Sequence, residues 1–199
     1  APDVDADLLG SDVTFGDYRA QTFVAKGRLP WRNGNGALAI DAQGLQLGLP
    51  LTALRANLRG AVERLQFDAE ADSALGALAL RGDANRQGSR WQGALGALQF
   101  DPAKGAAWSL QQPARWSWDG NGGALSRACL LSNAGGTLCA DADWPRRGVN
   151  VQGDQLPLAL LVPYLPERED GRPWVLVGEA ALVAQLKPAG NAWRGTATL

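Results

Sequence analysis

Histidine and methionine are absent from this chain of 199 residues, and cysteine occurs only twice. Without histidine, the chain contains no Ser-His-Asp or Cys-His arrangement for nucleophilic catalysis. Two cysteines without histidine also leave too few soft ligands for a zinc site. The sequence therefore predicts no enzyme, no catalytic residue, no cofactor and no metal site.

Neither sign of charge is in excess, since 19 basic residues face 20 acidic ones and both are scattered along the chain. Nucleic-acid-binding proteins gather basic residues on one face or stripe, so we expect no nucleic-acid partner. Carboxylates do recur at a spacing of two, as in Asp68, Glu70 and Asp72. We interpret them as the hydrated side of a strand rather than as the paired acids of a glycosidase.

Long apolar runs are also missing, because a helix that spans a bilayer needs about 18 or more such residues. The nearest candidate, residues 156–165, is interrupted by Pro157 and Pro163. These prolines predict one short helix or an extended plug near 157–165, lying over an apolar face. The polar stretch 166–173 is a weak internal boundary in what we expect to be a single domain over 1–199. We interpret the chain as an internal piece of a longer protein, with any membrane anchor outside it.

The chain does contain many short segments in which apolar and polar residues alternate, each followed by glycine or a polar turn. Leu38-Ala39-Ile40-Asp41 and Leu78-Ala79-Leu80-Arg81 are examples. An alternation of period two places one side of a segment in apolar surroundings and the other in water, as in a half-buried strand. The sequence therefore predicts an all-β fold in which one face of the sheet is apolar.

The predicted strands follow one another with short turns between them. Residues 52–59 have some helical propensity, but their alternation favours a strand. The remaining strands are expected at 4–9, 13–15, 21–29, 37–49 (with bulges or turns at Gly44 and Gly48), 61–70, 74–82, 89–100, 107–118, 149–152, 174–187 and 191–199.

The two cysteines flank a turn sequence, Ser132-Asn133-Ala134-Gly135-Gly136. A hairpin centred on Ala134 sets Cys129 opposite Cys139, close to the geometry of a disulfide. The alternative is a pair of buried thiols on one face. A disulfide would indicate an oxidising compartment, such as the periplasm or the cell exterior.

Tryptophan is abundant, with 8 residues, several of them in the middle of the chain. The motif Trp91-Gln92-Gly93 is echoed by Trp193-Arg194-Gly195, and each motif follows a polar turn. Aromatic pairs such as Trp116 and Trp118 can form stacking platforms for sugars or single-stranded nucleic acid. We favour a core or groove-lining role, because no basic groove accompanies them.

From Trp91 onward the order of features resembles the TamB family, the large periplasmic subunit of the translocation and assembly module of Gram-negative bacteria. Residues 1–90 match more loosely, as further strands of the same kind. The matching segments are Trp91-Gln92-Gly93-Ala94-Leu95, Leu98-Gln99-Phe100, Ala107-Trp108-Ser109-Leu110, Pro113, Ala128-Cys129-Leu130, Thr137-Leu138-Cys139-Ala140, Asp143-Trp144-Pro145, Leu156-Pro157-Leu158-Ala159-Leu160, Pro163-Tyr164-Leu165-Pro166, Gly178-Glu179 and Trp193-Arg194-Gly195.

The resemblance implies an elongated, curved antiparallel or mixed sheet that folds into a hydrophobic, taco-like groove. It implies a periplasmic location within an inner-membrane-anchored protein, and a TamA-like outer-membrane barrel as partner. It also implies a role in outer-membrane protein assembly, phospholipid transport or both, the latter by likeness to AsmA-type and bridge-like lipid transfer proteins. The groove would be lined by Leu38, Ile40, Leu45, Leu47, Leu65, Phe67, Leu78, Leu80, Leu95, Val149, Val151, Leu182 and Leu186.

Three functions remain open from the residues themselves. An uncovered apolar face can shield phospholipid acyl chains, or the open edges of the sheet can pair with client β-strands. The same face can instead be the dry core of a structural β-solenoid spacer. A carbohydrate-binding β-sandwich that uses the tryptophans is the third possibility.

Overall fold

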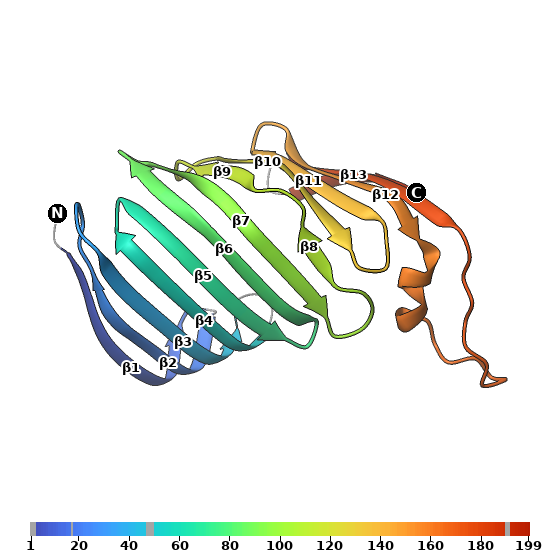
Figure 1. Cartoon of the computed structure of the whole chain (residues 1–199), viewed down its shortest axis with the longest axis horizontal. Helices are drawn as coiled ribbons and strands as arrows, with labels where there is room; N and C mark the ends of the chain where they lie inside the picture. The colour runs from blue at the N-terminus through green and yellow to red at the C-terminus, as the bar shows by residue number, and fades with distance from the viewer. Residues whose placement is uncertain (1–2, 17, 47–49, 190–191) are drawn as a thin grey trace.

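A computed structural model describes residues 3–16, 18–46, 50–189 and 192–199, and it confirms the predicted all-β fold. Within these residues the chain forms one antiparallel sheet of 14 strands and one short 3₁₀ helix, η1 (Figure 1). The elements are β1 (Val4–Phe15), β2 (Tyr18–Leu29), β3 (Gly36–Gln46), β4 (Pro50–Ala61), β5 (Arg64–Ser73), β6 (Gly76–Gln87), β7 (Arg90–Pro102), β8 (Trp108–Leu110), β9 (Ala114–Trp118), β10 (Gly123–Ser132), β11 (Thr137–Trp144), β12 (Gly148–Pro157), η1 (Leu158–Tyr164), β13 (Glu179–Ala189) and β14 (Ala192–Thr198).

Almost every strand pairs with the strands next to it in sequence, so the sheet is a long meander with β1 and β14 at its two edges. The short strands β8 and β9 both lie between β7 and β10 and are two halves of one interrupted strand. The prediction of a single strand over 107–118 is therefore wrong at residues 111–113. At these three residues the backbone leaves the ladder of strand hydrogen bonds. Just beyond them, at the start of β9, the Ser126 hydroxyl accepts a hydrogen bond of 2.8 Å from the Arg115 amide.

Two other predicted boundaries differ from the structure. The strands expected at 4–9 and 13–15 are one strand, β1, because both segments pair with β2 in a single register. Asp12, between them, has a positive φ of 52°. The strand expected over 174–187 begins only at Glu179. The preceding segment is held elsewhere, since the Trp174 indole donates a hydrogen bond of 2.6 Å to the Pro166 carbonyl. The bulge or turn expected at Gly48 lies outside the described residues.

The ambiguous segment 52–59 is a strand, as favoured, because β3 and β5 pair with it on both sides. A short helix near 157–165 is also confirmed as η1, which holds Pro163. The Tyr164 hydroxyl, at the end of η1, donates a hydrogen bond of 2.7 Å to the Lys104 carbonyl in the loop between β7 and β8. The boundary near 166–173 and the single-domain assignment stay predictions.

The sheet is elongated and curved, and its hairpin turns form two long rims (Figure 1). One row of turns runs along the upper left and top of Figure 1, and we call it the upper rim. It consists of the turns at residues 30–35, 62–63, 88–89, 119–122 and 145–147. The lower rim holds the turns at 74–75, 103–107 and 133–136. Successive upper turns are linked through the backbone: the Val62 amide donates to the Pro30 carbonyl at 2.8 Å, and the Arg86 amide to the Glu63 carbonyl at 2.9 Å.

The predicted hairpin of the two cysteines is present as β10 and β11. Cys129 stands directly opposite Cys139, and the two form a disulfide. Neighbouring residues on β10 alternate between the faces of the sheet, so the disulfide lies on the face opposite to Leu130. It therefore ties the two strands together from the polar side of the sheet.

One small hydrophobic cluster stabilises the β2–β4 region. Ala20, Ala42 and Leu45 are buried, and the half-buried Leu54 packs against them. We expect Leu54→Ala to lower the free energy of unfolding by about 1–2 kcal/mol, less than for a fully buried leucine. Leu9→Ala, at an 87% exposed position, is the matched control and should change it by less than about 0.5 kcal/mol. Equal effects of the two variants in urea unfolding would contradict the packing described.

Candidate functional site: the apolar face

The strand register gathers the predicted apolar residues on one face of the sheet. Residues directly opposite each other on paired strands project to the same side. Across five strands the register aligns Leu38, Leu58, Phe67, Gly82 and Leu95. The whole set of predicted residues on this apolar face is Leu38, Ile40, Leu45, Leu65, Phe67, Leu78, Leu80, Leu95, Val149, Val151, Leu182 and Leu186. Leu47, predicted with them, lies outside the described residues.

Bulges keep the face apolar where the alternation in the sequence breaks. Leu95 and Leu98 are three residues apart, so in a regular strand they would point to opposite sides. The register shifts between Arg81 and Gly82, which leaves Gly96 as an extra residue on β7 and returns both leucines to one face. On β3 the register does not shift, but Gly44 has a φ of +61°, and Ala42 and Leu45 on either side of it pack in one cluster.

Sequence reasoning missed part of this face, because several of its members follow irregular stretches. Trp116 belongs to it through its pairing with Gly93 and Leu125. Phe100 and Trp108 pair with each other and continue the row that begins with Leu78. The pairing of β6 with β7 across their turn could have predicted Phe100, whereas Trp108 and Trp116 required the pairing of β8 and β9 with β7.

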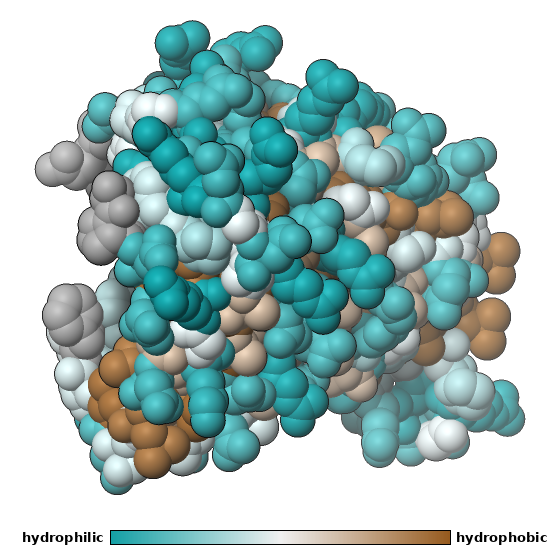
Figure 2. Space-filling view, turned by 60° about the vertical axis from the view of Figure 1, so that its left-hand side comes forward, coloured by the Kyte–Doolittle hydropathy of each residue, from teal (hydrophilic) through white to brown (hydrophobic). Residues whose placement is uncertain are grey.

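The opposite, polar face is covered by hydrophilic cross-strand pairs. Arg55 and Asp41 form an exposed ion pair at 3.7 Å, and the Asn57 amide donates to Asp68 at 2.9 Å. Such exposed pairs contribute little to stability but keep this face hydrated. Figure 2 shows hydrophilic side chains over most of the visible surface, with hydrophobic ones in separate patches at its lower left and right.

No described helix or second sheet packs over the apolar face, since the strands contact mainly their neighbours within the sheet. Even so, Leu38 and Leu45 keep only 8% and 7% of their surface exposed. Leucines on a flat, open sheet would keep more, so the sheet itself must bend around this face. Elsewhere on it Phe67, Leu80 and Val151 are half-buried. The curved sheet and its apolar face thus form a trough, which is sheltered without being packed solid.

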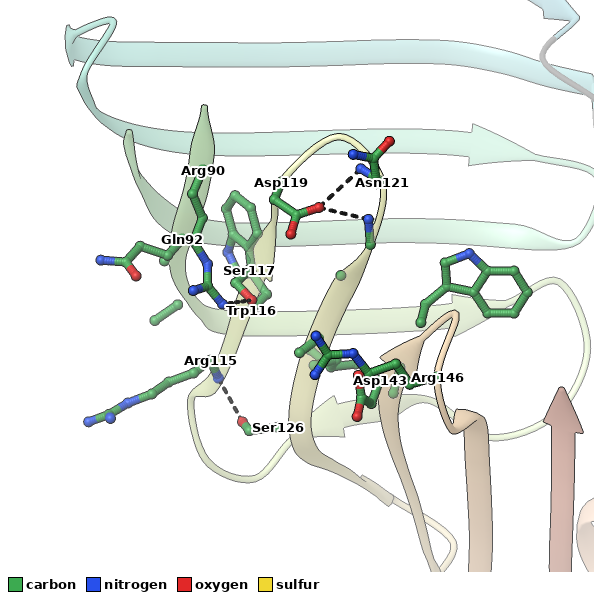
Figure 3. Close-up of a pocket in the computed structure, with 18 of the residues that line it drawn as sticks. Arg90, Gln92, Arg115, Trp116, Ser117, Asp119, Asn121, Ser126, Asp143 and Arg146 are labelled. Atoms are coloured by element: carbon green, nitrogen blue, oxygen red, sulfur yellow. Dashed lines mark hydrogen bonds between the residues drawn. The ribbon is translucent and has the colours of Figure 1, made fainter. Parts of the chain in front are cut away.

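Three hollows lie over the polar face. The largest of these three, of about 1020 Å³, is lined by arginines and aspartates from β6, β7, β9, β11 and the turns 119–122 and 145–147 (Figure 3). In this hollow the amides of Asn121 and Gly122 donate to Asp119 and hold the pKa of that carboxyl below its ordinary value. The hollows of about 880 and 290 Å³ also have mixed linings. Charges of both signs make these hollows hydrated surface, so the apolar face is the stronger candidate site.

The described residues offer little chemistry beyond burial of apolar groups. They include no group of three or more histidine, cysteine or carboxylate side chains placed to hold a metal ion. Both cysteines are used in the disulfide. Among the described helices, none is long and apolar enough to cross a membrane. What the arrangement can do is shelter hydrophobic material along one face.

The model of one known family, described as TamB, N-terminal domain, matches residues 1–186. This match includes the first ninety residues, whose resemblance to the family is looser in the sequence itself. Neither the curated proteins nor the solved structures gave a match. Because the family model covers nearly the whole chain, the chain belongs to the TamB family.

Proposed function

We propose that this chain shields hydrophobic cargo, with phospholipid acyl chains lying along the apolar face while the protein bridges the space between inner and outer membranes. The observation that carries the proposal is the continuous apolar face, which crosses the sheet from β2 to β13 with no described element packed over it. Burial of each CH₂ group of an acyl chain is worth about 0.8 kcal/mol and demands no particular orientation. A leucine, valine and alanine lining suits such cargo.

Membership of the TamB family supports a role in translocation and assembly, and the proposal sets the shielding of cargo within that role. We propose a TamA-like barrel as the partner of the full-length protein, and a periplasmic location within an inner-membrane-anchored chain. The disulfide is consistent with an oxidising compartment. No catalytic step is part of the proposal.

The two other candidate functions find less support. A β-solenoid stacks its strands in parallel, whereas all strand pairs in the described part are antiparallel. A β-sandwich needs two sheets, and the described strands belong to one. One feature favours client β-strands as a second cargo: within the described residues, the outer edges of β1 and β14 pair with no further strand.

Native mass spectrometry of the purified protein tests the proposal. We expect phospholipid to copurify and to be released by detergent, because exposed apolar surface of this extent binds amphiphiles. Lipid extracts of the same preparation identify the bound species. A lipid-free protein that also fails to take up phospholipid from added vesicles would refute the shielding of acyl chains.

A further inference from the structure

Five of the tryptophans lie along the upper rim, although they are far apart in sequence. Each stands in or beside a turn of that rim, or at the start of β14. The register places those on strands on the apolar side of the sheet, so the row borders the apolar face. The five, named here the tryptophan row, are Trp31, Trp91, Trp118, Trp144 and Trp193.

Neighbouring members of the row are in contact or in register. Trp91 is directly opposite Trp118 across β7 and β9. Gly123 lies between Trp118 and Trp144, and a Cβ added to it would come within 2.9 Å of the Trp118 ring. The Trp144 and Trp193 rings stack with centroids 4.5 Å apart. The two Trp-x-Gly motifs of the sequence thus begin strands at the same rim.

Arg86 joins the first two members of the row. Its guanidinium lies 5.0 Å from the Trp31 ring centroid and 5.7 Å from that of Trp91, within range for cation–π interactions. The Nε of Arg86 also donates to the Gly88 carbonyl at 3.0 Å. The guanidinium is held between two indoles, and no carboxylate among the described residues pairs with it.

The two rims differ in charge. Three upper-rim arginines are paired with carboxylates: Arg28 with Asp3 at 2.7 Å, Arg32 with Glu63 and Arg147 with Asp143, both at 2.9 Å. Beyond these pairs the upper rim has more basic than acidic residues: Arg64, Arg86, Arg90, Arg146, Lys187 and Arg194, against Asp5 and Asp119. Of the basic residues on strands, only Arg86 stands on the apolar side of the sheet, opposite Trp91. Along the described lower rim acidic residues predominate: Asp12, Asp72, Asp101, Asp154 and Glu179, against Arg19 and Lys104.

The indole N–H groups of the row are available to a ligand. Of the described tryptophans, Trp174 alone donates its indole N–H to a protein acceptor, and it lies outside the row. None of the described side chains has a buried polar atom without a partner, so the N–H groups of the row reach solvent. Trp118 and Trp193 are 44% and 60% exposed. Indoles with an apolar body and a free N–H are typical of the boundary between acyl chains and lipid headgroups.

The geometry points to the upper rim as the headgroup site of the trough: the tryptophan row and Arg86 bind the phosphates and ester groups of anionic phospholipids. Their acyl chains lie below the row on the apolar face, and this inference rests on the proposed function. Guanidinium groups suit phosphate, and each basic residue near an anionic headgroup strengthens its binding. The acidic lower rim disfavours the same headgroups. Lipids would therefore lie in one orientation across the trough.

Bromine quenching of tryptophan fluorescence tests this orientation in the whole chain. The probes are phosphatidylglycerols brominated either near the head of the acyl chain or near its end. Trp118→Phe combined with Trp193→Phe should remove much of the quenching by the near-head bromines. The matched variant Trp108→Phe, on the apolar face near the lower rim, should remove mainly quenching by bromines near the chain end.

A second measurement tests the charge. Arg86→Gln should reduce the preference for phosphatidylglycerol over phosphatidylcholine about fivefold. Arg19→Gln, at the lower rim, should leave the preference unchanged.

The outcomes separate the two proposals. Absence of quenching by either lipid in the unmodified protein overturns the shielding of acyl chains itself. Quenching that the upper-rim and Trp108 variants reduce alike, or a lipid preference unchanged in Arg86→Gln, overturns only the orientation.

Discussion

Replacing Leu80 by aspartate is expected to reduce phospholipid occupancy about ten- to a hundredfold, equivalent to about 1.4–2.8 kcal/mol of binding free energy. Leu80 is half-buried on the apolar face in the middle of β6, opposite Ala69 and Leu98. A carboxylate there must either lose part of its hydration against an acyl chain or hold water within the trough. The measurement is bound phospholipid per chain by native mass spectrometry.

The fold should survive this change, because Leu80 keeps access to solvent when no cargo is bound. We expect unchanged strand content by circular dichroism and a loss of about 1–2 kcal/mol in the free energy of unfolding. In a dry core the same unpaired charge would cost about 3–5 kcal/mol and would leave little folded protein. Failure to fold would therefore support the structural spacer instead of the trough. The matched tests at Ile40 and Leu182 extend the comparison to both halves of the sheet.

Ala97→Asp is the control for Leu80→Asp. Ala97 is exposed on the polar face of β7, directly opposite Arg81. A carboxylate there stays hydrated and faces a cation, so lipid occupancy and stability should both remain near the unmodified values. Equal loss of lipid in both variants would mean that charge anywhere on the sheet disturbs binding, and that the apolar face is not the site.

Removing the disulfide with Cys129→Ser and Cys139→Ser should lower the free energy of unfolding by about 2–3 kcal/mol. The bond closes a loop with a sequence separation of 10, and in the chain-entropy model this loop restricts the unfolded chain. The hairpin depends on it more than most, since a bulge interrupts the pairing of β10 with β11 between Leu125 and Ala128. Urea unfolding under non-reducing conditions measures the change.

Reductant added to the unmodified protein should reproduce this loss of stability and should not affect the double variant further. Leu131→Ser, an exposed position on the same strand and on the same face as Cys129, controls for loss of side-chain volume there. If the double variant and the unmodified protein unfold at the same urea concentration, the cysteines are thiols in solution.

Local alternation was sufficient to predict most strands, because each half-buried strand shows its own two faces in its sequence. It predicted the paired cysteines for a similar reason: the turn chemistry of Asn133, Gly135 and Gly136 fixes which residues stand opposite. It failed at 107–118, where a strand is divided, and at 174–178, where a hydrogen bond of Trp174 holds the segment outside the sheet.

The sequence by itself determined the all-β class, the hairpin, the short helix and the apolar residues, since all of these depend on near neighbours in the chain. Only the tertiary structure decided that Leu45, Leu95 and Val151 share a face, because bulges reverse the alternation and the register carries it from strand to strand. Only the tertiary structure also brought the tryptophans and arginines of distant turns to one rim. Trp31 and Arg86, and likewise Trp144 and Trp193, become neighbours there although about fifty positions separate each pair, because an antiparallel meander returns every second turn to the same edge.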